Sequence, residues 1–295
     1  MKLISHYSLH HSFARDQAEL PDLRALIAPW VPQRIRRIDR YIELCVAGGL
    51  NCVAGRQLPE NTGVYLATRA GAVSTPAEVM EGIFAQQDTP MPLHFVNTLG
   101  NTAGFYLTQL LHTKGNTVVV AQEQLSFEAA LLHAWLDLQQ GRIHTALVGG
   151  FDEAALPLAQ HARRLGVDAQ DEIAEGSHWL LLSTETTNTA AITLGNPVYF
   201  ADVEEVLEWL REQDVQHLQC AFNPTAEEQA QLTNVVGEVQ VCTQTGISQG
   251  AFSGGSLIEL CARVEQFGKS GIHLARNFSH GDAGSYCALR VDLSQ

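Results

Sequence analysis

The sequence lacks any apolar run long enough to cross a bilayer. Its longest runs, such as Ala146–Gly150 and Trp179–Leu182, span only a few residues, whereas a membrane-spanning helix needs about 20 apolar residues. The first residues, Met1–His6, soon turn polar and do not form the apolar core of a signal peptide. We therefore expect a cytoplasmic protein with no membrane partner.

Paired cysteines are also missing. No CxxC pair is present, so neither a disulfide framework nor a zinc site is expected. The neighbouring His10 and His11 have no third ligand at a suitable spacing, which favours an exposed or strand-edge pair over a metal site. We expect no cofactor and no metal, and buried, reduced thiols with one reactive cysteine as the alternative. The cysteines are Cys45, Cys52, Cys220, Cys242, Cys261 and Cys287.

Basic residues are scarce. The chain has 18 Lys and Arg against 32 Asp and Glu, which gives a net charge of −14. Such an excess of negative charge repels phosphate backbones, so nucleic acid is not expected as a partner. The single dense basic cluster consists of Arg34, Arg36, Arg37 and Arg40. It is either a solvated helix face or a docking site for an acidic partner.

Strand-like and helix-like patterns alternate through the 295 residues. Continuous apolar runs are typical of strands covered on both faces, and apolar residues at three- and four-residue steps indicate amphipathic helices. This alternation predicts a layered α/β fold. The expected helices include 127–138, which Gly141 ends, 203–210 and 257–264. The expected strands are 63–67, 117–121, 145–149, 179–183, 190–194, 217–222, 239–243, 271–275 and 286–291.

The spacing of these elements changes near residue 185. Glu185–Asn188 is polar, and a new strand–helix–strand series begins after it. We therefore predict two similar halves, 1–185 and 186–295, packed into one compact unit.

Several stretches, in order, resemble the β-ketoacyl synthase family. Arg36–Arg40 reads Arg-Arg-Ile-Asp-Arg and opens a helix, and Gly115–Gln124 looks like the strand that leads to the family's nucleophile elbow. The helix behind the elbow and the later central strands are also similar. These further matches are Ser126–Gly141, His144–Gly150, Glu175–Leu182, Gly246–Ala251 and Asn277–Ser285. The resemblance implies a thiolase-like, layered α-β-α-β-α fold of two pseudo-repeated halves.

Family members condense acyl chains with a thiol nucleophile and two imidazoles, and all three groups are absent here. The thiol position falls on Gln124, or on Gln122 after a two-residue slip, and an amide nitrogen cannot form the thioester. The imidazole positions fall on Asn223 and Ile247. The resemblance therefore implies no catalytic residue. The alternative for Gln124 is a polar residue that opens a helix and has no further role.

A glutamine at the nucleophile position is also found in chain-length factors, the inactive partners of polyketide ketosynthases. This resemblance implies a non-catalytic subunit that pairs with a catalytic ketosynthase and, through that complex, meets an acyl carrier protein. Loading-type ketosynthase domains also carry glutamine, but they keep both imidazoles. The expected setting is polyketide, aryl polyene or fatty-acid-like biosynthesis.

The resemblance also assigns further residues. It places Met91–Tyr106 at the dimer interface, where four side chains would shape the partner's acyl tunnel: Asn97, Asn101, Phe105 and Tyr106. The arginine cluster would dock the acidic carrier protein. Gly246–Gly255 is either a phosphate-binding turn or a turn for close helix packing. The second hypothesis for function is an acyltransferase or hydrolase acting on acyl thioesters, with Cys220 as a displaced nucleophile; a buried structural thiol is the alternative for Cys220.

Overall fold

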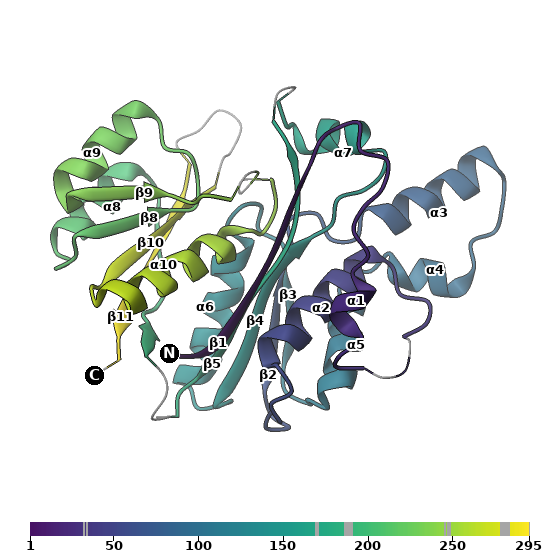
Figure 1. Cartoon of the computed structure of the whole chain (residues 1–295), viewed down its shortest axis with the longest axis horizontal. Coiled ribbons are helices and arrows are strands. Elements are labelled where there is room, and N and C mark those ends of the chain that lie inside the picture. The colour runs from purple at the N-terminus through teal and green to yellow at the C-terminus, as the bar shows by residue number, and fades with distance from the viewer. Residues whose placement is uncertain are drawn as a thin grey trace.

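The computed structural model describes residues 1–31, 33, 35–168, 171–185, 191–244, 246, 249–277 and 284–294. Its strands form one eleven-stranded mixed sheet in the order β3-β2-β4-β5-β1-β6-β11-β10-β8-β9, with β7 paired to β11 (Figure 1). The sheet is strongly curved, so that its two ends act as two separate layers with helices between and outside them (Figure 1).

The first half of the chain supplies one end of this sheet. Parallel strands β2, β3 and β4 are followed by β5, which is antiparallel to β4 and to the N-terminal strand β1. The strands are β1 Lys2–Phe13, β2 Gly63–Ala67, β3 Thr117–Val120, β4 Thr145–Asp152 and β5 Ile173–Ser183. The helices are α1 Arg24–Ile27, α2 Arg40–Val53, α3 Ser74–Ala85, α4 Pro92–Asn97, α5 Thr102–Leu111, α6 Ser126–Gln139 and α7 Leu158–Leu165.

The second half repeats this topology. Parallel strands β8, β9 and β10 are followed by β11, which is antiparallel to β10 and to β6. Its strands are β6 Ile192–Leu194, β7 Val198–Phe200, β8 His217–Cys220, β9 Glu238–Val241, β10 Gly271–Arg276 and β11 Tyr286–Leu293. Its helices are α8 Val203–Arg211, α9 Ala226–Val236 and α10 Ser253–Phe267. The sequence prediction of two pseudo-repeated halves in a layered α/β fold is therefore confirmed.

The two halves meet through β1 and through the middle helices. Lys2 and Leu3 of β1 pair with Thr193 and Ile192 of β6, which joins the halves into one sheet. Between the sheet layers lie α6 and α10, whose apolar side chains form a shared core with both halves. In the outer layers, α2 and α5 cover the first half and α8 and α9 cover the second. Residues 186–190, at the predicted boundary, lie outside the described part.

Local sequence signals set several helix starts. Asp39 and Asp202 accept hydrogen bonds from the backbone N–H groups of Ile42 and Glu205, each at 3.0 Å, and so cap α2 and α8. A reciprocal capping box between Thr225 and Glu228 begins α9. Of the three helices predicted from periodicity, α8 has such a cap and begins at residue 203 as predicted, whereas α6 and α10 begin without a side-chain cap. Within the described residues, no helix has the length and apolar character needed to cross a membrane.

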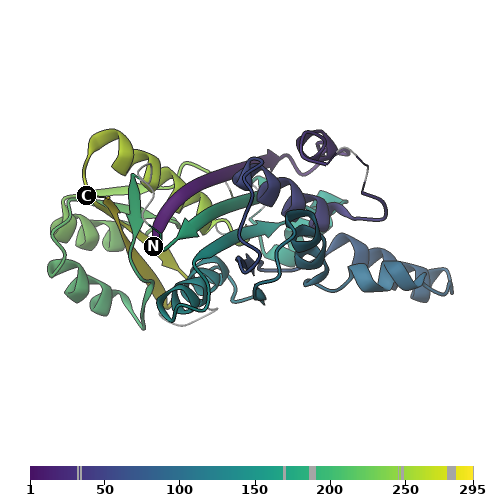
Figure 2. The same cartoon turned by 90° about the horizontal axis from the view of Figure 1, so that it is seen from below.

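Two helices stand apart from the layers. The helices α3 and α4 project at the end of the molecule that is far from α8 and α9 (Figure 2). Few of their side chains are buried: Thr75 in α3 and Asn97 in α4. This arm therefore contributes little to the core, and its exposed face is available for contacts outside the chain.

Candidate functional site

The turn from β3 into α6, residues 121–125, is the elbow that the sequence predicts. Glu123 has a positive φ of 49°, a conformation that costs a non-glycine residue strain. Ser126 holds the turn, because its hydroxyl accepts a hydrogen bond from Gln122 N at 2.8 Å and donates one to Glu123 O at 2.7 Å. The strained backbone is thus kept in place by α6, as an elbow requires.

The side chains of the elbow carry no nucleophile. Gln122 and Glu123 are exposed, and Glu123 forms an ion pair with Arg69, with Nε and Oε2 3.2 Å apart. Gln124 is half-buried, and its buried Oε1 atom has no hydrogen-bond partner. Ser126 is fully buried and held by the backbone. The strained position of the turn is therefore occupied by an acidic side chain, with an amide on each side.

The two positions at which the resemblance expects imidazoles carry no histidine. Asn223 is exposed in the loop that follows β8, and Ile247 lies outside the described residues. The predicted absence of a condensing triad remains a prediction from the sequence. Of the neighbouring histidines on β1, His11 lies 3.4 Å from Glu175, and the His10 ring lies 5.6 Å from that of His178. Among the described residues, no three His, Cys, Asp or Glu side chains are placed to hold a metal ion.

Cys220, the proposed displaced nucleophile, is fully buried at the end of β8. Burial is the main cause that raises its pKa to about 12, and the charge of Glu228 adds to that effect. A nucleophilic cysteine needs a thiolate near neutral pH and access to substrate, and Cys220 has neither. All six cysteines are buried and outside any disulfide, which confirms the sequence prediction of buried thiols.

We expect Cys220 to resist alkylation in the folded protein. Incubation with N-ethylmaleimide or with an acyl thioester at pH 7.5, followed by mass spectrometry, should leave every cysteine unmodified, because none is exposed. The same reagent should label all six after unfolding in guanidinium chloride. A single rapid adduct on Cys220 in the native protein would contradict this and restore the acyltransferase hypothesis.

Asp152, at the end of β4, is an anchor that sequence reasoning missed. It is buried and accepts hydrogen bonds from Thr68 Oγ1 at 2.6 Å, from Arg69 N at 2.9 Å and from Ala251 N at 2.7 Å. It thereby fixes the end of β2 to the turn before α10. No local pattern could identify it, because its partners are about 80 and 100 residues away in sequence.

The glycine-rich turn before α10 serves close packing. A Cβ atom on Gly254 would lie 2.6 Å from the Phe127 ring of α6, and one on Gly150 would lie 2.3 Å from the Ala251 carbonyl oxygen. Only glycine allows β4, α6 and α10 to approach this closely. Of the two interpretations of Gly246–Gly255, the described residues thus support the packing turn.

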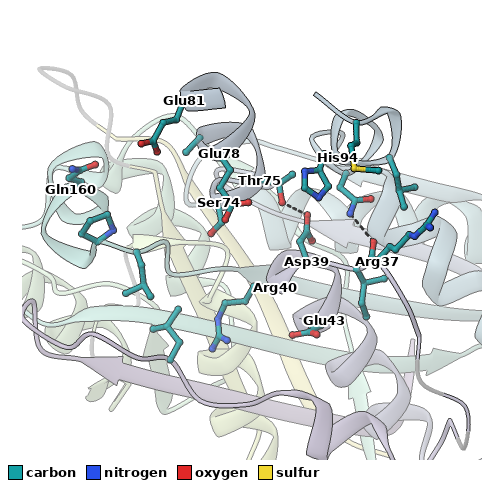
Figure 3. Close-up of a pocket in the computed structure, with 18 of the residues that line it drawn as sticks. Arg37, Asp39, Arg40, Glu43, Ser74, Thr75, Glu78, Glu81, His94 and Gln160 are labelled. Atoms are coloured by element: carbon teal, nitrogen blue, oxygen red, sulfur yellow. Dashed lines mark hydrogen bonds between the residues drawn. The ribbon is translucent and has the colours of Figure 1, made fainter. Parts of the chain in front are cut away.

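A pocket of about 890 Å³ opens beside the arm formed by α3 and α4 (Figure 3). Its walls come from the start of α2, from α3, α4 and α7, and thus lie near the carboxyl ends of β2 and β4, where open α/β sheets place their ligand sites. Two residues that the sequence singled out meet here, because Asn97 Nδ2 donates to the Arg37 carbonyl oxygen at 3.0 Å (Figure 3). Asn97 is buried, and its Oδ1 atom has no partner.

The arginine cluster is divided by the fold. Arg40 forms a two-bonded ion pair with the buried Glu175, at 2.5 and 2.6 Å, so it holds α2 to β5. Arg36 and Arg37 are exposed, and Arg34 lies outside the described residues. The docking role predicted for the cluster therefore applies, as a prediction, to Arg36 and Arg37 more than to Arg40.

Two carboxyls, Asp39 in the pocket wall and Glu153 behind it, anchor the arm. Asp39 accepts from Thr75 Oγ1 at 2.6 Å, which ties the arm to the cap of α2 (Figure 3). Glu153 accepts from Val73 N at 2.6 Å and Ser74 N at 2.9 Å at the start of α3. Burial raises the pKa of Glu153 to about 7, against the opposing effect of these hydrogen bonds. Both carboxyls hold the base of α3 through these hydrogen bonds, so neither is available to bind a ligand.

Large apolar side chains are exposed on the arm and on α5. Of the twelve such side chains in the described residues, eight fall between residues 80 and 105, and we call these eight the α3–α5 apolar surface. Phe105 is 59% exposed, Tyr106 is half-buried and Asn101 is exposed. Concentrated apolar exposure of this kind marks interaction sites. The α3–α5 apolar surface consists of Met80, Ile83, Phe84, Met91, Phe95, Val96, Leu99 and Phe105.

The sheet ends at β3, which packs against α5, the helix that carries Phe105. β3 forms one end of the strand order, so one row of its backbone N–H and C=O groups has no neighbouring strand among the residues that the structure describes. Its residues are exposed or half-buried. An open edge strand is a ready template for pairing with another chain.

Of the known proteins compared with this chain, only solved structures are similar to it. No protein-family model matches the sequence, and no curated protein matches it. A structure described as the ishigamide ketosynthase/chain length factor aligns with a TM-score of 0.70 and 16% identity, covering 91% of this chain and 85% of that one. A β-ketoacyl synthase from Burkholderia phymatum STM815 aligns with a TM-score of 0.66 and 13% identity, over 91% and 86%.

A third structure contains AntDE and AntF, a type II polyketide synthase acyl-carrier protein in complex with its ketosynthase bound to the hexaketide. It aligns with a TM-score of 0.71 and 13% identity, over 99% of this chain and 98% of that one. At these identities the similarity establishes the fold. The chain thus has the thiolase-like fold of the ketosynthases, as its motifs predict.

Proposed function

We propose that this chain is a non-catalytic ketosynthase-like subunit, a chain-length factor, that pairs with an active β-ketoacyl-ACP synthase. The observation that carries this proposal is the elbow. Its backbone is strained at Glu123, next to Gln124, where the resemblance places the thiol of the catalytic enzymes, but residues 121–125 supply only Ala, Gln, Glu and Leu side chains. A protein that keeps this turn without a nucleophile would act through its shape and through its contacts with a catalytic partner.

The α3–α5 apolar surface and the open edge of β3 support a pairing role. They lie in the same half of the chain, and a partner that covered both would remove apolar side chains from water and complete the backbone hydrogen bonds of the edge. We assign Phe105 and Tyr106 to this interface, where they would limit the depth of the partner's acyl tunnel. Asn101 would lie at its rim, and Asn97 would support it from within through the Arg37 carbonyl oxygen.

The acidic carrier protein would approach the complex through exposed arginines. Arg36 and Arg37 are exposed beside the pocket mouth, and Arg164 of α7 also lines it. Ion pairs of this kind steer association and weaken with salt. One similar structure is described as a ketosynthase/chain length factor, and another contains a type II polyketide synthase carrier protein in complex with its ketosynthase; these neighbours support a polyketide setting. We extend the proposal to aryl polyene or fatty-acid-like biosynthesis, and to the cytoplasm.

The decisive experiment is co-expression with a ketosynthase that has an intact Cys-His-His set and is encoded beside this gene. We expect a 1:1 complex in size-exclusion chromatography, and condensation of malonyl groups on a carrier protein only when both subunits are present. The chain alone should yield no elongated product by mass spectrometry, because the elbow has no thiol. Elongation by the isolated chain, or failure to bind any such ketosynthase, would refute the proposal.

A further inference from the structure

A second cavity, of about 650 Å³, lies in the other half of the molecule. It is a groove between β8, β9 and the C-terminal part of α10, and so lies near the amino ends of these strands, away from the elbow. Its floor is formed by alternate residues of the two strands. They face one another across the ladder as the pairs His217–Glu238 and Gln219–Gln240.

The equivalent face in the first half is apolar and packed. There, Tyr65 of β2 lies in the shared core, with Val118 and Val120 of β3 packed against it under α6. In β8 and β9 the same strand positions carry imidazole, carboxylate and amide groups, while the opposite face keeps Leu218 and Cys220 in its own core. The two halves have the same topology, but β8 and β9 carry polar side chains at positions where packing alone would favour apolar ones.

The orientation of the two amides is fixed by carboxylates. Gln219 Nε2 donates to Glu259 Oε2 at 3.2 Å, and Gln240 Nε2 donates to Glu238. A carboxylate accepts hydrogen bonds and does not donate them, so neither amide can be flipped. Their Oε1 atoms are buried and have no hydrogen-bond partner. Because Gln219 is only 1% exposed, bulk water does not replace the missing partner of its Oε1 atom. Each leaves an acceptor that needs an N–H or O–H group.

The opening of the groove is positively charged. Arg263 and Lys269 line it, and neither takes part in an ion pair within the described residues. Phe267, 64% exposed, and Val264 give one wall an apolar character. The carboxylate of Glu238 in the groove lies 2.7 Å from His217 Nδ1, and that of Glu259 accepts hydrogen bonds from Gln219 and Thr243. Both acidic groups thus have partners other than Arg263 and Lys269, and in a chain of net charge −14 these two cations favour an anion at the opening.

We propose that this groove binds a small anionic molecule that also carries N–H donors. The amide oxygens of Gln219 and Gln240 accept from the N–H groups, Arg263 and Lys269 bind the phosphate or carboxylate, and Phe267 covers the apolar part. A cavity of this size is in the range that holds such ligands. The site does not depend on the function proposed above.

Isothermal titration calorimetry of the full chain with three probes tests the site. Adenosine 5′-monophosphate and pantetheine 4′-phosphate both combine a phosphate with N–H groups, and they distinguish a nucleotide from an amide-bearing arm. Inorganic phosphate alone is the third probe. We expect at least one of the first two to bind, and to bind more tightly than phosphate. Absence of binding by both, or equal affinity for phosphate, would overturn the proposal.

Variants locate the binding. Gln219→Leu removes the buried acceptor, and we expect it to raise Kd about tenfold or more, since an unmade buried hydrogen bond costs about 1–3 kcal/mol. Arg263→Gln, at the half-buried rim, should weaken binding without touching the core. Gln213→Leu, the same change on the far side of β8 beside α8, is the matched control and should bind like the wild type. Unchanged affinity in both groove variants would show that any ligand sits elsewhere.

Discussion

Phe105→Asp is expected to abolish pairing with a ketosynthase partner while leaving this chain folded. The ring is 59% exposed on α5, inside the α3–α5 apolar surface, so the change removes no core contact. In an interface, however, it places an unpaired carboxylate where an aromatic anchor was buried. Truncation of such an anchor typically costs 2 kcal/mol or more, which is about a 30-fold rise in Kd, and a buried charge adds to that cost.

The control is Phe267→Asp. Phe267 is 64% exposed at the end of α10, in the half that does not contain the α3–α5 apolar surface. Biolayer interferometry with the immobilised ketosynthase should give wild-type affinity for this variant and no measurable binding for Phe105→Asp. Thermal unfolding should show similar melting temperatures for both. If both variants bind equally, the interface lies elsewhere and the α3–α5 apolar surface has another role.

Much of the fold could be predicted because buried parallel strands have a plain signature. The predicted strand 63–67 coincides with β2, and 271–275 matches β10 within one residue. The 12-residue strand β1 was not predicted, although it joins the two halves. Its sequence mixes Ser, His and Tyr with apolar residues, because one strand must meet β5, β6 and the buried rings near α10. Such a strand shows neither clean alternation nor an apolar run.

The candidate site was predictable only in part, because its residues act across long sequence distances. The elbow and its missing nucleophile could be located from the motifs around 115–150. The ion pair of Arg40 with Glu175 spans 135 residues, and it converts a residue predicted to be a docking group into a support for α2. The polar floor of the groove was also missed, since Gln219 and Gln240 become unusual only beside the packed face of the first half.

His178, at the centre of β5, should make the protein sensitive to acid. Its ring is fully buried, its Nδ1 atom lies 2.9 Å from Ser8 Oγ, and its Nε2 atom has no partner. Burial, together with the nearby His10, lowers its pKa from 6.5 to about 3. The folded state therefore binds a proton at this ring less readily than the unfolded state does. The contribution of the neutral His178 ring to the free energy of unfolding is thus fully present above pH 6.5 and is lost as the pH falls towards 3.

The expected loss of unfolding free energy from this one group is about 2 kcal/mol at pH 5, because each pKa unit corresponds to about 1.4 kcal/mol. Urea denaturation at pH 7.5 and pH 5.0 measures it. In His178→Asn, which keeps a hydrogen-bonding group near Ser8, the loss between these two pH values should be smaller by that amount, even if the variant is less stable at both.

The exposed His133→Asn variant should lose stability between the two pH values as the wild type does. His161, whose pKa burial lowers to about 4, contributes a loss of the same sign. It is present in all three proteins, so the difference between His178→Asn and the others isolates His178. Equal losses in all three would mean that the ring is protonated without penalty, and hence that water reaches the strand between β1 and β4. The packing of Phe252 and Gly255 against His178 argues against such access.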